Sequence, residues 1–120
     1  MGKDEFVAGL KGMEFEIHDL ADNRVAVGKY SIEDGRFKGQ VVKVGFEIPL
    51  DFPATPPSGP HINPCLIPMN PSGTTHNDKA VPSPLGDGWQ YLSRPYPNWP
   101  GTKRSMPVYM AHIRQLLETL

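Results

Sequence analysis

Alternating apolar and polar residues predict an antiparallel sheet in the first half of the chain. Residues 13–18 and 42–48 each place apolar side chains at every second position, which is typical of strands with one buried face. Between them the alternation changes phase beside Gly28, which predicts a β-bulge. Asp34-Gly35 predicts a hairpin turn, and the apolar residues within 58–67 predict a short fourth strand. The pattern therefore predicts a four-stranded antiparallel meander.

Residues 105–120 follow a helical pattern instead. Ser105 can cap a helix, and Pro107 suits its first turn, where a missing N–H costs little. One face of this helix is apolar and carries Tyr109, Ile113, Leu116, Leu117 and Leu120. A helix packed on one face of an antiparallel sheet gives an α+β fold, and the length of the chain suits a single domain, residues 1–120. One or two further helical turns are expected at residues 4–10.

A proline-rich crossover joins the sheet to the C-terminal helix. Most of the 14 prolines lie between residues 49 and 107, but aromatic side chains are interleaved with them, and disordered segments are poor in aromatic residues. We therefore expect an ordered, irregular wrap. Proline cannot donate to a strand ladder and restricts the residue before it. A bend that ends the third strand is predicted at Phe52, Pro53, Pro56 and Pro57.

Composition narrows the classes of function. The formal net charge is −1 and the basic residues are scattered, so no nucleic-acid partner is predicted. No apolar run is long enough to cross a membrane, and the acidic N-terminal residues do not resemble a secretory signal. The single cysteine excludes an internal disulfide and is typical of a reducing compartment. A cytoplasmic protein is expected.

Three sequence segments resemble a known superfamily. They are "GKYSIEDGRF" at residues 28–37, "FEIPLDFPATPP" at residues 46–57 and "GWQYLSRPYPNWPG" at residues 88–101, followed by the helix. In this order they resemble the ubiquitin-conjugating-enzyme (UBC-like) superfamily, including its inactive variants and the RWD domains. They are most similar to the bacterial prokaryotic conjugating-enzyme-like family E. Pro95 and Leu92 depart from that pattern, since the family tends to have histidine and a second tryptophan there.

The resemblance implies a thioester-forming cysteine and an asparagine that stabilises the developing oxyanion. The chain has no His-Pro-Asn tripeptide, and its lone Cys65 comes too soon after the bend for the usual position. Cys65 is either a displaced nucleophile or a small buried apolar residue at the end of a strand. As a nucleophile it would be assisted by His61 or His76 and by Asn63 or Asn77.

A serine or threonine within residues 70–79 is a second candidate nucleophile, because His76 is close to it in sequence and a hydroxyl needs an adjacent base. The alternative is an ordinary polar loop. His61, Cys65 and His76 could also be interpreted as zinc ligands, but structural zinc sites use four ligands in tighter pairs. We predict no metal site and no cofactor.

Four residues of the crossover are candidate binding residues: Trp89, Arg94, Tyr96 and Trp99. Arg94 could bind a partner carboxylate or hold the crossover through backbone carbonyl groups. The tryptophans could be binding anchors or the local core of the wrap. Proline-rich grooves lined by tyrosine and tryptophan can also take extended peptides.

The resemblance implies a protein of a bacterial ubiquitin-like modification pathway. Its implied partners are a ubiquitin-like protein, an activating enzyme and a deconjugating peptidase. Because the usual cysteine motif is missing, we expect non-covalent binding of the ubiquitin-like protein, as in a pseudoenzyme. Two alternatives stay open: an active conjugating enzyme that uses Cys65 or a crossover serine or threonine, and an RWD-like or peptide-binding interaction module.

Overall fold

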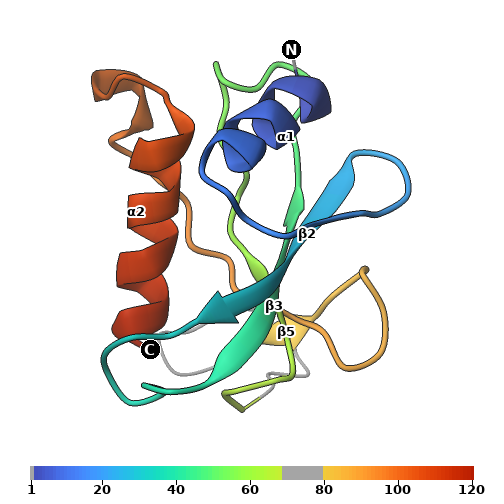
Figure 1. Ribbon diagram of the computed structural model, residues 1–120, viewed down its shortest axis with the longest axis vertical. Helices are drawn as coiled ribbons and strands as arrows, with labels where there is room; N and C mark the ends of the chain where they lie inside the picture. The colour runs from blue at the N-terminus through green and yellow to red at the C-terminus, as the bar shows by residue number, and fades with distance from the viewer. Residues whose placement is uncertain (1, 69–79) are drawn as a thin grey trace.

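The protein is an α+β domain in which two helices cover one face of an antiparallel sheet (Figure 1). This computed structural model describes residues 2–68 and 80–120. The helices are α1 (Lys3–Gly12) and α2 (Met106–Glu118), and a 3-10 helix spans Trp99–Gly101. The strands are β1 (Ile17–Asp19), β2 (Arg24–Ser31), β3 (Val41–Glu47), β4 (His61–Asn63), β5 (Val81–Pro82) and β6 (Gln90–Tyr91).

The sheet has the order β1-β2-β3-β4-β6-β5, and every pairing is antiparallel. The predicted meander of four consecutive antiparallel strands is confirmed, but its first strand, β1, begins at Ile17 instead of residue 13, because α1 and a turn occupy the chain up to residue 14. The sheet is larger than predicted, because the crossover adds the two-residue strands β5 and β6 beside β4. Strands this short show no periodicity, so the sequence pattern could not find them. The predicted bulge is also confirmed: the β2–β3 register shifts between Val27 and Tyr30, next to Gly28.

The two ends of the chain form the helices. The first helix runs from Lys3 to Gly12 and is longer than the one or two turns expected. The second helix begins after Ser105, as predicted, but the Ser105 side chain makes no capping hydrogen bond. The predicted apolar face is buried at Tyr109, Ile113, Leu116 and Leu117.

Phe46 of β3 shows that both helices lie on the same face of the sheet. Its ring centroid is 5.1 Å from that of Phe6 in α1 and 5.8 Å from that of Tyr109 in α2. Phe6 and Tyr109 also contact each other, at 6.0 Å between centroids. Figure 1 shows the two helices next to each other, with the strands running beneath α1. Among the described residues no helix lies on the other face of the sheet, called the helix-free face below, and this face holds the candidate site.

The predicted bend lies between β3 and β4 and is anchored in the core. The peptide bond between Phe52 and Pro53 is cis. Phe52 is buried, with its ring 5.1 Å from Phe6 and 6.1 Å from Trp99 between centroids. Pro57 is buried and Pro56 half-buried. The bend therefore ends the third strand and returns the chain to the sheet as β4.

Candidate functional site

Cys65 lies two residues beyond the end of β4 and is exposed, so it is not the buried apolar residue that one interpretation expected. Within the described residues its hydrogen-bond partner is the carbonyl oxygen of Gly88, 3.5 Å from Sγ. A carbonyl oxygen accepts the thiol proton without removing it, so this contact does not create a thiolate. Two residues predicted to assist Cys65, His76 and Asn77, lie outside the described residues, as do the hydroxyl residues of segment 70–79.

His61 was also predicted to assist Cys65, but the structure pairs it with other groups. It lies opposite Gly45 of β3 and Tyr91 of β6, and residues directly opposite in an antiparallel sheet share a face. At Gly45 that face is covered by Leu85 and Trp89, since a Cβ built on Gly45 would meet both side chains. His61 therefore lies on the helix-free face, beneath the loop that joins β5 to β6.

The His61 imidazole has a different neighbour on each side. Its Nδ1 is 2.7 Å from Ser83 Oγ, and its Nε2 is 3.6 Å from Glu47 Oε1. Its ring stacks on Tyr91, with 4.6 Å between centroids and 25° between planes. Glu47 is held in turn by Arg24, whose Nε and Nη2 both lie 3.2 Å from Glu47 Oε2. The serine, the histidine and the carboxylate therefore lie next to one another in this order in space.

Burial keeps this imidazole neutral. His61 is 1 % exposed, and desolvation lowers its pKa from 6.5 to about 4, while Glu47 opposes the shift and Arg24 adds to it. At neutral pH one ring nitrogen therefore carries a proton and the other has a lone pair. The chemistry open to such a group is to accept a proton from a neighbouring hydroxyl.

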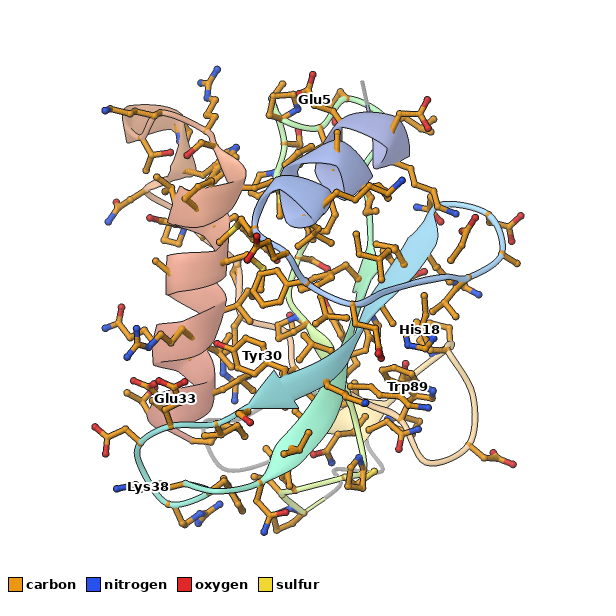
Figure 2. All side chains as sticks on the ribbon, viewed as in Figure 1. Glu5, His18, Tyr30, Glu33, Lys38 and Trp89 are labelled. Atoms are coloured by element: carbon orange, nitrogen blue, oxygen red, sulfur yellow. The ribbon has the colours of Figure 1, made fainter. Side chains whose placement is uncertain are left out.

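The four predicted binding residues lie in three different parts of the structure. Trp99 is fully buried, with its ring against Phe52 and Tyr109. It is a core residue, so its prediction as a binding residue is wrong. Trp89 is half-buried over the helix-free face, and Figure 2 shows it on the same side of the molecule as His18, away from α2. Arg94 and Tyr96 lie instead beside α2.

Arg94 and Tyr96 contribute to a groove along α2. Two adjoining hollows, of about 500 and 490 Å³, share His112 and Gln115. Arg94 lines the first and Tyr96 the second. Tyr96 stacks on His112 with 4.3 Å between ring centroids, and His112 Nε2 is 3.4 Å from the Arg94 carbonyl oxygen. Arg94 Nη1 also donates to the Ser93 carbonyl oxygen at 3.0 Å, so the arginine holds the crossover as well as lining the groove.

Sequence reasoning missed three residues of the His61 cluster: Glu47, Ser83 and Tyr91. The alternation in β3 did place Glu47 on the polar face, but it gave no reason to pair Glu47 with His61. Ser83 and Tyr91 lie in the segment without periodicity. Within residues 2–68 and 80–120, no group of three or more His, Cys, Asp or Glu could hold a metal ion. No helix in those ranges is long and apolar enough to cross a membrane.

Comparison of the chain with protein-family models, with curated proteins and with solved structures finds no significant match.

Proposed function

We propose that the chain is a UBC-like domain of a bacterial, cytoplasmic ubiquitin-like modification pathway, and that it binds a ubiquitin-like protein without carrying it as a thioester. The order of elements supports the proposal: a meander, a Phe-Pro bend with its buried Phe52, an irregular crossover and a C-terminal helix. The single free cysteine is in keeping with a reducing compartment.

The observation that carries the non-covalent mechanism is the environment of Cys65. A conjugating nucleophile needs a thiolate, which is made by an adjacent base or a nearby positive charge. Among the described residues the partner of Cys65 Sγ is a backbone carbonyl oxygen, and the nearest histidine in sequence, His61, is engaged by Ser83 and Glu47. The described surroundings of Cys65 therefore favour non-covalent binding over thioester formation.

The groove along α2 is the surface that we assign to the partner's C-terminal tail. Among the described residues that line it, Arg94 is basic and none is Asp or Glu. An extended tail that ends in a carboxylate complements this charge. Tyr96, Pro95 and Pro97 supply the aromatic and proline surface on which extended peptides dock.

Binding can be tested with the ubiquitin-like protein from the same genome. Titration calorimetry without ATP should detect a reversible complex, and Cys65→Ala should leave its Kd unchanged. Gln115→Glu adds a carboxylate where the two hollows meet, and should weaken binding about fivefold, since like charges a few ångströms apart in water repel by about 1 kcal/mol. Gln40→Glu is the matched control, because it makes the same change on an exposed residue of the β2–β3 hairpin.

Three results would speak against the proposal. Absence of any detectable binding would refute the proposal. A thiol-sensitive adduct that forms with activating enzyme and ATP and disappears in Cys65→Ala would make the chain a conjugating enzyme. Binding of unrelated extended peptides with equal affinity would make it a peptide-binding module of the RWD type.

A further inference from the structure

Three elements bring a hydroxyl, an imidazole and a carboxylate together on the helix-free face. Ser83 follows β5, His61 begins β4 and Glu47 ends β3. The distances are 2.7 Å from Ser83 Oγ to His61 Nδ1 and 3.6 Å from His61 Nε2 to Glu47 Oε1. The second distance exceeds a hydrogen bond, so Glu47 acts on His61 through its charge. A nucleophile, a base and a group that orients the base are the parts of an activated serine.

The two neighbours of His61 determine which nitrogen carries the proton. Glu47 forms an ion pair with Arg24, and a carboxylate disfavours a lone pair pointing at it, so the N–H is on Nε2. Nδ1 is then an acceptor, and the Ser83 hydroxyl donates to it. Ser83 Oγ also accepts a hydrogen bond from the Leu85 N–H at 3.0 Å. That donor stabilises negative charge that develops on Oγ as its proton leaves.

We propose that Ser83 is a nucleophile toward activated acyl groups such as thioesters, with His61 as its base and Glu47 as a positioning residue. Ser83 Oγ forms a bond to the acyl carbon as its proton passes to His61 Nδ1. The carbon–sulfur bond breaks, the thiolate leaves, and it takes the proton from His61. The product is an ester on Ser83 and a free thiol. This activity goes beyond the proposed function, because it requires neither Cys65 nor a ubiquitin-like protein.

The exposure of Ser83 and the basicity of His61 determine what kind of reaction to expect. Ser83 is partly exposed, whereas His61 is buried beneath it, so an acyl donor can approach Oγ while water is kept from the imidazole. The lowered pKa of His61, about 4, makes it a weaker base than a histidine with an ordinary pKa. We therefore expect slow, stoichiometric modification of Ser83 rather than rapid turnover.

A fluorophosphonate probe tests the nucleophile without any partner protein. The probe reacts when Ser83 Oγ forms a bond to phosphorus, fluoride leaves, and the serine proton passes to His61. The Cys65→Ala protein removes the only thiol and serves as the parent. Intact mass should show one adduct, and peptide mapping should place it on Ser83. Acylation by a small aryl thioester should modify the same residue.

Variants can show whether Ser83 reacts because His61 activates it or only because it is exposed. Ser83→Ala and His61→Gln should each abolish labelling or slow it about a hundredfold, since glutamine can hydrogen-bond to Ser83 but cannot remove its proton. Ser58→Ala is the matched control: Ser58 is an exposed serine whose hydroxyl lies 2.6 Å from that of Tyr91 instead of a histidine nitrogen. Its removal should leave labelling unchanged. Glu47→Gln should lower the maximal labelling rate at an unchanged half-saturating probe concentration.

Absence of an adduct on the folded parent protein, or an adduct that maps elsewhere, would overturn the proposal. An adduct on Ser83 that forms equally fast in His61→Gln would also overturn it. Because these assays contain no ubiquitin-like protein, their failure is distinguishable from failure of the proposed function, which calorimetry measures.

Discussion

Trp99 Nε1 donates a 2.7 Å hydrogen bond to the carbonyl oxygen of Pro53, 46 residues earlier in the chain. The bond joins the end of the crossover to the bend where the sheet ends. The Trp99 ring strengthens the connection by stacking on Phe52 and meeting Tyr109 edge-on, at 6.1 and 5.9 Å between centroids. Trp99 thus fixes both ends of the segment that carries His61 and Ser83.

Replacing Trp99 by phenylalanine should therefore destabilise the whole domain. The substitution removes the donor to Pro53 and leaves a cavity where the larger ring lay, and we expect a loss of about 2–4 kcal/mol in the free energy of unfolding. Urea unfolding followed by circular dichroism measures it without relying on tryptophan fluorescence. Trp89→Phe is the control and should cost less than about 1 kcal/mol, because Trp89 is half-exposed. Equal losses in both variants would contradict this role of Trp99.

Elements with sustained periodicity were predictable from the sequence, and elements held by distant contacts were not. The alternation in β3 and the apolar face of α2 both recur over several residues, so each predicts its own element. β6 has two residues, and its place depends on the buried Gln90 side chain. That amide accepts from the Leu66 and Ile67 N–H groups and donates to the Ile67 carbonyl oxygen. Such bonds join residues more than twenty positions apart and leave no local pattern.

Distant contacts also form the candidate site. His61 could be singled out as a histidine near a cysteine, but its true neighbour, Ser83, is 22 residues away. Only the return of the crossover to the sheet edge as β5 and β6 brings the two together. The lining of the groove along α2, which among the described residues contains no lysine, aspartate or glutamate, likewise depends on how the crossover lies against the helix.

Tyr109 should tolerate the loss of its hydroxyl. Within the described residues its hydroxyl oxygen is the one buried side-chain polar atom without a hydrogen-bond partner, and burial raises the pKa of the phenol. A buried polar group without a partner costs about 1–3 kcal/mol. Tyr109→Phe keeps the ring and removes this cost, so the free energy of unfolding should rise by about 1 kcal/mol. Thermal unfolding of the variant beside Phe46→Leu, which should be clearly destabilised, would check it. A fall in stability for Tyr109→Phe would show that the hydroxyl has a partner.

Two glycines of α1 should respond in opposite ways to alanine. A Cβ on Gly9 would meet Cγ and Cβ of Met106, at the start of α2, whereas a Cβ on Gly12 has nothing within 4 Å. Overpacking at a helix contact costs about 1–3 kcal/mol, and alanine is favoured over glycine in a helix by about 0.5–1 kcal/mol. Gly9→Ala should therefore be destabilising and Gly12→Ala neutral or stabilising. Urea unfolding of the two variants measures the difference, and equal effects would mean that α1 and α2 do not meet closely at Gly9.

The stability of the domain should fall as the pH drops from about 6.5 to 4, in part because of His61. Its pKa is lowered by burial to about 4, so between these values the unfolded chain binds a proton that the folded chain excludes. Above pH 6.5 both states are neutral at this position and the contribution of His61 is constant. Below pH 4 both are protonated and it is constant again. Between pH 6.5 and 4, His61 should lower the free energy of unfolding by about 2–3 kcal/mol at most.

His61→Gln isolates this contribution from the titration of carboxylates. The free energy of unfolding from urea titrations should decline less steeply with falling pH in the variant than in the wild type, and the two curves should run parallel above pH 7. His18→Gln is the control, since it makes the same replacement at an exposed histidine. Parallel curves for His61→Gln and the wild type between pH 4 and 6.5 would mean that burial does not lower the pKa of His61.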